Sequence, residues 1–169
     1  MEKGLTRLTA LFLGVLIAVS CGIYSFSGTS IQPDVKTVNI HYVEYKALRV
    51  NPALSNQMTE ALRDKFQKLT RLEQVEDEGD LDLASEIIGY DVKPTAVTAD
   101  EVAAQNRLTV AMKVYFTNRK HPEDNFEKSF SSYADYDSQN SLDAVEATLC
   151  EEIVDKLVED IFNASVANW

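Results

Sequence analysis

The sequence is short of positive charge, and this shortage argues against one large class of partner. Its 169 residues hold 16 Lys and Arg against 27 Asp and Glu, so the formal net charge is -11 at pH 7. A protein that binds nucleic acid needs a basic surface to neutralise phosphates, so we expect no nucleic-acid partner. Local basic surfaces remain possible, because the acidic surplus is concentrated in residues 141–163.

Sequence motifs for catalysis and for metal binding are also missing. The two histidines, His41 and His121, have no metal-ligand or catalytic-triad spacing around them. The sequence contains neither a Gly-x-Ser-x-Gly elbow nor a glycine-rich phosphate loop. We therefore expect that the protein is not an enzyme and that it has no metal site and no non-covalent cofactor.

The start of the chain has the pattern of an export signal. Lys3 and Arg7 precede an apolar run over residues 8–19. A dozen residues are too few for a stable membrane-spanning helix, which needs about 20. This length disfavours the alternative of an uncleaved membrane helix, and we interpret residues 1–20 as a signal peptide.

The signal ends in Ala18-Val19-Ser20-Cys21, which is similar to the lipobox of bacterial lipoproteins. Ala18 departs from that pattern, because a large aliphatic residue is usual there. The similarity implies that Cys21 becomes the first mature residue and carries acyl chains such as palmitate, a covalent lipid anchor that is stable when several chains are attached. Gly22 follows in place of the Asp that retains lipoproteins at the inner membrane. Since an acidic surface-export cluster is also missing, we expect an outer-membrane anchor on the periplasmic side.

The rest of the chain divides into a short N-terminal segment and one domain. Residues 21–34 contain Tyr24, Phe26 and Ile31, which favour an ordered or docking segment over a free linker. Residues 35–169 are enough for a single core, which we expect to be an α+β periplasmic domain. With Cys21 lipidated, no intramolecular disulfide can form, and Cys150 is expected to be a buried structural thiol.

Two helices are predicted from apolar residues at helical spacing. Asn51-Pro52 is a favourable helix start, because Asn accepts from unpaired N–H groups and Pro lacks a donor that would be unpaired. The buried stripe of this helix should comprise Leu54, Met58, Leu62 and Phe66, widened by Ala61 and Leu69. The second helix should cover residues 141–163, with a buried column of Leu142, Val145, Leu149, Ile153, Leu157 and Ile161 beside Cys150, Val154 and Val158.

Four strands are predicted from alternating apolar and polar residues. Residues 35–42 should place Val38, Ile40 and Tyr42 on one side. Residues 81–92 alternate imperfectly, with one face carrying Ile88, Tyr90 and Val92. Pro94 cannot donate to a β ladder, so we expect it to end the pairing of this second strand.

The third strand has the clearest alternation in the chain. Its apolar side should comprise Leu108, Val110, Met112, Val114 and Phe116, and its polar side Arg107, Thr109, Ala111, Lys113 and Tyr115. A hairpin loop over residues 119–125 should lead to a fourth strand at 126–136. The order β-α-β-β-β-α predicts a two-layer α+β sandwich, with a four-stranded, mostly antiparallel sheet and both helices on one face.

Several short stretches, in this order, resemble one known family. They are the residues from Cys21 to Gly28, Gly79-Asp80-Leu81, the run from Glu86 to Tyr90 with Pro94, the run from Asn106 to Val110, and the terminus from Ile153 to Trp169. With the lipobox and the element order, they resemble the lipopolysaccharide-assembly lipoproteins of the LptE family, particularly members from the Bacteroidetes. The resemblance spans the whole mature chain.

The resemblance implies a role without covalent chemistry in the Gram-negative outer membrane. A protein of this kind sits in the lumen of a large β-barrel, LptD, in a 1:1 complex. It helps the barrel to assemble and assists insertion of lipopolysaccharide into the outer leaflet. Two alternatives stay open, namely a periplasmic carrier or chaperone lipoprotein for another amphiphile or outer-membrane protein, and a structural envelope lipoprotein that associates with itself.

A lipopolysaccharide-binding role calls for Lys or Arg on rigid elements, because charge-assisted contacts to phosphate are strong there. The candidates are Arg107 and Lys113 on the third strand, Lys93 at the end of the second, Lys128 on the fourth, and Arg119 and Lys120 in the hairpin loop. Each of these side chains is also compatible with an ordinary solvated charge.

Overall fold

The structure, a computed structural model, describes residues 31–95 and 105–167. The elements in chain order are β1 (Thr37–Ile40), β2 (Glu44–Tyr45), α2 (Leu54–Leu69), β3 (Glu73–Gln74), β4 (Leu81–Thr95), β5 (Gln105–Asn118), the 3₁₀ turn η1 (Pro122–Asp124), β6 (Phe126–Asp137) and α3 (Leu142–Val166). The signal peptide and most of the 21–34 segment lie outside the described residues, so both stay predictions. No helix within the described ranges is long and apolar enough to cross a membrane.

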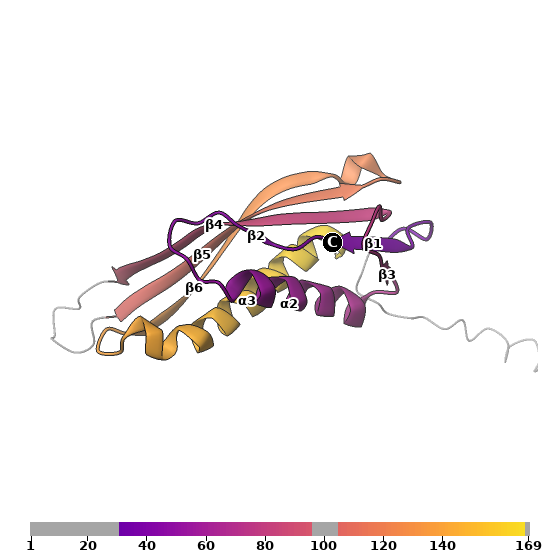
Figure 1. Ribbon diagram of the computed structural model, residues 1–169. Helices are drawn as coiled ribbons and strands as arrows, with labels where there is room; N and C mark the ends of the chain where they lie inside the picture. The colour runs from indigo at the N-terminus through magenta and orange to yellow at the C-terminus, as the bar shows by residue number, and fades with distance from the viewer. Residues whose placement is uncertain (1–30, 96–104, 168–169) are drawn as a thin grey trace, which may run out of the picture.

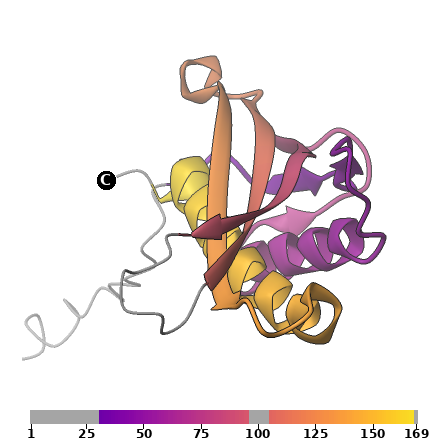
Figure 2. The same ribbon diagram turned by 90° about the vertical axis from the view of Figure 1, so that its left-hand side faces the viewer.

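One sheet and two helices form the two layers that the sequence predicts. In Figure 1 both helices lie on the same side of the sheet, and in Figure 2 they lie next to each other. The α+β class and the placement of the helices are therefore confirmed.

The sheet itself differs from the expected four-stranded, mostly antiparallel one. It has six strands in the order β3-β1-β4-β5-β6, with β2 also paired to β4. The ladders between β1 and β3, β1 and β4, and β2 and β4 are parallel, whereas β4-β5-β6 is antiparallel. The sequence pattern did not predict β2 and β3, because each is two residues long and too short to show alternation.

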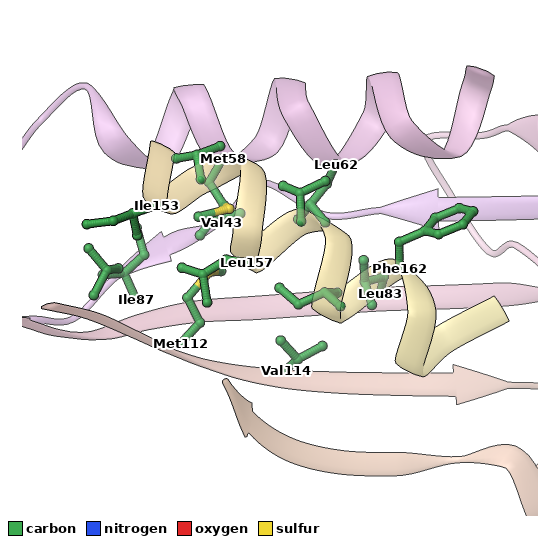
Figure 3. Close-up of a cluster of buried hydrophobic side chains, with 14 of the residues drawn as sticks. Val43, Met58, Leu62, Leu83, Ile87, Met112, Val114, Ile153, Leu157 and Phe162 are labelled. Atoms are coloured by element: carbon green, nitrogen blue, oxygen red, sulfur yellow. The ribbon is translucent and has the colours of Figure 1, made fainter. Parts of the chain in front are cut away.

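The core lies between the sheet and the helices, as the apolar stripes predict. On α2 the four expected residues Leu54, Met58, Leu62 and Phe66 are completely buried. On α3 the buried residues are Leu149, Cys150, Ile153, Val154, Leu157, Val158, Ile161, Phe162 and Val166. Leu142 and Val145, which were predicted to be buried, are only partly buried. Figure 3 shows Leu157 and Ile153 pointing between α2 and the strands, and the rings of Phe66 and Phe162 meet edge to face at 5.1 Å.

The first strand is shorter than expected, and the predicted position of one of its residues is wrong. Val38 and Ile40 are buried, but Tyr42 is 56% exposed and Val43 takes the core position instead. The chain leaves regular pairing after Ile40, which shifts the alternation by one residue. Leu69 at the end of α2 is also exposed, so it does not widen the stripe of that helix.

A β-bulge explains the imperfect alternation of the second long strand. The register of β4 against β5 shifts between Ile87 and Gly89. Ile87 and Tyr90 therefore both face the core, while Ile88 is 43% exposed. The assignment of Ile88 to the face of Tyr90 is wrong because one extra residue lies between the two halves of the strand.

The expectation that Pro94 ends the pairing of this strand is also wrong. Pro94 pairs with Asn106, and the ladder continues to Thr95 opposite Gln105. Within the described residues, β4 has a partner on its other side only as far as Ile87, where β2 ends. An edge position tolerates a missing backbone donor, which accounts for a proline inside the strand here.

Candidate functional site

The candidate site is the sheet face opposite the helices, which we call the open face. In Figure 1 the helices lie below the sheet, and no described element covers its upper side. Along β5 the residues Leu108 to Phe116 alternate between buried and partly exposed, because successive side chains point to opposite faces. The polar side of this strand therefore lines the open face, as expected from the sequence.

A compact cluster of charged and aromatic side chains lies at one end of the open face. Arg107 donates two hydrogen bonds to Asp135 on β6, from Nε at 2.7 Å and from Nη2 at 2.8 Å. Its guanidinium also stacks on the ring of Tyr133, 3.6 Å from the centroid. The carboxylate of Asp135 raises the pKa of Arg107, and the guanidinium lowers the pKa of Asp135. This geometry holds a planar cation rigidly on the sheet.

Lys93 extends this cluster by one strand. It lies opposite Arg107 in the antiparallel ladder between β4 and β5. Lys93 is exposed and makes no ion pair with any side chain in the described part of the chain. Of the predicted candidates, Lys93 and Arg107 are thus brought together at one place.

Lys113 lies on the same face but in a separate group. Its Nζ is 2.5 Å from Glu127 on β6 and 5.2 Å from the ring centroid of Tyr115. The carboxylate of Glu127 raises the pKa of Lys113. Lys113 is six positions from Arg107, roughly 20 Å along a strand at about 3.3 Å per residue. One phosphate therefore cannot contact both side chains.

Beside Lys113 the open face has a shallow hollow. His41, Tyr42, Glu44, Ala84, Ser85, Glu86 and Tyr115 line it. Lys46 lies at its rim, 2.5 Å from Glu86 and 3.1 Å from Glu44, and these carboxylates raise its pKa. The exposed ring of Tyr42, which the sequence placed on the same side as Val38 and Ile40, forms part of this surface.

Arg119 and Lys120 lie at the end of the sheet, where acidic side chains surround them. Arg119 is 3.2 Å from Glu78 and 3.3 Å from Asp82, and both carboxylates raise its pKa. Lys120 is 3.5 Å from Asp80. The hairpin loop is therefore a paired cluster and not a free basic patch.

Lys128 does not belong to the open face. Its neighbours Glu127 and Ser129 pair with Tyr115 and Lys113 on the open side, whereas Lys128 pairs with the core residue Val114. Its Nζ lies 4.8 Å from the ring centroid of Phe126. The structure thus separates Lys128 from Arg107, Lys113 and Lys93.

The aromatic members of the site were missed by reasoning from the sequence. Tyr133 is 48% exposed and supports Arg107, yet β6 was read only as a returning strand. A signal was available, because Tyr133 and Asp135 are two positions apart and must lie on the same face of the strand. Cys21 lies outside the described residues, so its lipidation stays a prediction.

One cysteine, Cys150, lies within the described part of the chain, and it is buried. No group of three or more His, Cys, Asp or Glu side chains among residues 31–95 and 105–167 could hold a metal ion. Cys150 is buried beside the Tyr90 hydroxyl, with 3.8 Å between the oxygen and Sγ, and burial raises the pKa of its thiol. A buried thiol with a raised pKa is a weak nucleophile, which suits a structural role.

Comparison with known proteins gives one clear family match. No curated protein sequence matches the chain. Similar solved structures include a minor lipoprotein from Acinetobacter baumannii, with 12% identity, 75% of this chain and 89% of that chain covered, and a TM-score of 0.49. A neuraminyllactose-binding hemagglutinin homolog from Helicobacter pylori has 10% identity and a TM-score of 0.48, with 77% of this chain and 86% of that chain covered. A hypothetical protein from Chlamydia trachomatis has 10% identity and a TM-score of 0.46, with 79% of this chain and 99% of that chain covered.

The family match covers nearly all of the folded domain. Residues 35–165 match the sequence profile of LptE, described as lipopolysaccharide-assembly. The matched range begins before β1 and ends within the last turn of α3. The chain therefore belongs to the LptE family of lipopolysaccharide-assembly proteins.

Proposed function

We propose that the chain is an outer-membrane lipoprotein, anchored through Cys21, that plugs an LptD-type β-barrel and helps it to assemble. In this role it assists insertion of lipopolysaccharide into the outer leaflet and forms a 1:1 complex with the barrel. The observation that carries the proposal is the family match over residues 35–165. An enzymatic function is not part of it, since the role requires binding and positioning alone.

The open face has the chemistry that a plug needs. The lumen of a large outer-membrane barrel is polar, so a protein inside it must present polar surface. The exposed side chains of β5 and β6 are held by cross-strand pairs, among them Arg107 with Asp135 and Lys113 with Glu127. A polar face whose side chains are already ordered loses less conformational entropy on docking.

We further propose that Lys93 and Arg107 form the principal contact for a lipopolysaccharide phosphate. They lie opposite each other on neighbouring strands, and Lys93 makes no ion pair within the described part of the chain. Arg107 keeps its planar orientation through Asp135 and Tyr133. Lys113 would contribute a separate contact farther along the face, whereas Arg119 and Lys120 are engaged by carboxylates.

Affinity purification of the full-length lipidated chain in detergent tests the plug. We expect a large β-barrel to co-purify at equal stoichiometry and to be identified by mass spectrometry. Recovery of the chain without a barrel would contradict the plug and favour the carrier alternative. Self-association without a barrel would favour the structural alternative.

Lipopolysaccharide binding by the same purified chain tests the basic residues. Lys93→Glu with Arg107→Glu should weaken binding about tenfold or more, and Lys113→Glu alone should weaken it less, because charge-assisted phosphate contacts are lost. Lys36→Glu with Lys68→Glu changes the net charge equally at exposed positions away from the open face, and it is the matched control. Equal losses in both double variants would show a net-charge effect and refute the assignment of the site.

A further inference from the structure

Strand β6 forms a long free edge of the sheet. It is the last strand in the order β3-β1-β4-β5-β6, and within the described residues it pairs with β5 alone. All of its 12 residues are in regular extended structure, and the ladder to β5 has no register shift. An edge strand presents a row of backbone donors and acceptors that another strand can pair with.

The middle of β6 lacks the usual protections of an edge strand, although both of its ends carry charged residues. Proteins block such edges with proline, bulges, charged side chains or very short strands. The sequence from Phe126 to Asp137 contains no proline, and the run from Ser129 to Ala134 contains no charged residue. The middle of this edge is therefore chemically open to pairing.

One lysine shows which backbone groups point outward. Lys156 Nζ on α3 lies 3.4 Å from the backbone oxygen of Tyr133, so this oxygen is directed toward the free edge. In an antiparallel strand the N–H and C=O of one residue point to the same edge, and successive residues alternate. The groups of Ser129, Ser131, Tyr133 and Asp135 therefore face outward. Lys156 is the only basic residue of α3, and its Nζ also donates to Glu152 Oε1 at 2.7 Å.

The surface beside this edge is strongly acidic. Ser132, Asp155, Lys156, Glu159 and Asp160 line a shallow groove between α3 and β6. Glu159 is bonded to Lys65 of α2, but Asp155 and Asp160 make no ion pair with the described side chains. Both carboxylates are exposed, and three acidic side chains line the groove against Lys156 alone, although Asp155 also borders a hollow that contains Lys65 and Lys68.

We propose that the free edge of β6 accepts an extended segment of another protein as an added strand, and that this segment carries Lys or Arg toward α3. Backbone pairing supplies affinity in this mode of recognition, and alternate side chains supply specificity. The helix-side residues of the added strand would lie over Asp155 and Asp160, where positive charge is complementary. This interface adjoins the open face, because Tyr133 and Asp135, which hold Arg107, both belong to β6.

A second copy of this chain fits the edge poorly. Self-pairing would bring two acidic α3 helices together, with Asp155 and Asp160 on each. Pairing centred on Ser131 would also set Glu127 opposite Asp135 of the other copy. Like charges in these positions oppose association, which favours a basic partner over a homodimer.

The test uses the full-length chain in detergent and a ten-residue blocked peptide of alternating Val and Lys. Binding is measured by calorimetry, and hydrogen exchange of the backbone amides is followed by NMR. We expect saturable binding and at least tenfold slower exchange at Ser129, Ser131 and Tyr133. A peptide with Glu in place of Lys should bind at least tenfold more weakly. The same is expected of the basic peptide with four central residues N-methylated, because this removes backbone donors from both edges of the peptide strand.

A pair of matched variants separates local charge from net charge. Asp155→Lys with Asp160→Lys should weaken binding of the basic peptide about tenfold. Glu76→Lys with Asp77→Lys makes the same change beyond β3, at the opposite edge of the sheet, and should leave binding unchanged. Equal effects of the two pairs, protection outside β6, undiminished binding of the N-methylated peptide, or self-association of the chain would each overturn the proposal.

Discussion

His121 and Asp34 join the hairpin loop to the beginning of the folded domain. The Nε2 atom of His121 lies 3.0 Å from one carboxylate oxygen of Asp34 and 3.2 Å from the other. A second link runs in parallel, because Gln32 Nε2 donates to Asp124 Oδ2 at 2.8 Å. These contacts hold Gln32 and Asp34 beside the loop between β5 and β6.

This pair should make stability depend on pH in a defined window. The hydrogen bond to Asp34 raises the pKa of His121 above 6.5, and the same bond lowers the pKa of Asp34 below 3.8. The contribution from His121 is complete below pH 6.5 and is lost as the pH rises through its folded pKa. The contribution from Asp34 is complete above pH 3.8 and is lost as the pH falls through its folded pKa.

His121→Gln should therefore lower Tm more at pH 5 than at pH 8.5. Thermal unfolding followed by circular dichroism at both pH values measures this difference. Asp34→Asn removes the other half of the pair and should show the same dependence on pH. An equal Tm difference for His121→Gln at both pH values would contradict the assignment of a charged pair.

Gly79 and Gly89 should respond differently to the same substitution. A Cβ atom at Gly79 would lie 2.6 Å from the backbone oxygen of Leu81 and 2.7 Å from the backbone nitrogen of Asn39. Both atoms belong to paired strands and cannot move easily, so Gly79→Ala should lower the free energy of unfolding by about 1–3 kcal/mol. Urea denaturation measures this change.

Gly89→Ala is the matched control for that experiment. A Cβ there would meet the Cβ of Ala111 at 3.1 Å, a side-chain contact next to the bulge. The cost should be smaller than at Gly79, and replacing Ala111 by Gly should relieve it. A larger loss of unfolding free energy for Gly89→Ala than for Gly79→Ala would contradict this prediction, because it would mean that the bulge has less room for a Cβ atom than the turn before β4.

Leu157 and Leu48 offer a second matched comparison. Leu157 is completely buried between α2 and the sheet, and Leu48 is fully exposed in the segment between β2 and α2. Leu157→Ala should cost about 2–5 kcal/mol of unfolding free energy, because a cavity is left in the core. Leu48→Ala should change it by no more than about 0.5 kcal/mol. Denaturant titrations of the two variants check both values, and similar losses would contradict the placement of α3.

The sequence predicted those features that repeat along one element. The stripe through Met58 and Leu62 on α2 and the alternation through Val110 and Met112 on β5 both follow from local periodicity, and burial confirms them. The bulge at Ile88 breaks periodicity by a single residue, so the pattern alone could not show on which side of it each half lies. The two-residue strands are held by neighbours distant in sequence, and no local signal marks them.

The candidate site was less predictable, for a related reason. The placement of Arg107 and Lys113 on one face follows from alternation within β5. Their carboxylate partners Asp135 and Glu127 come from another strand and depend on register, which is set by the hairpin between β5 and β6. Whether a basic side chain is free or engaged is thus a property of the pairing of strands, not of the residue.

The two cysteines give a direct test of the proposed anchor. Cys150 is 2% exposed, and burial raises the pKa of its thiol, so it should not react with a thiol reagent in the native protein. After unfolding, one thiol per chain should react if Cys21 is lipidated, and two should react if it is unmodified. Cys150→Ala provides the control, since its unfolded chain should then have no reactive thiol at all. A remaining thiol in that variant would belong to Cys21, and the acyl anchor would have to be abandoned.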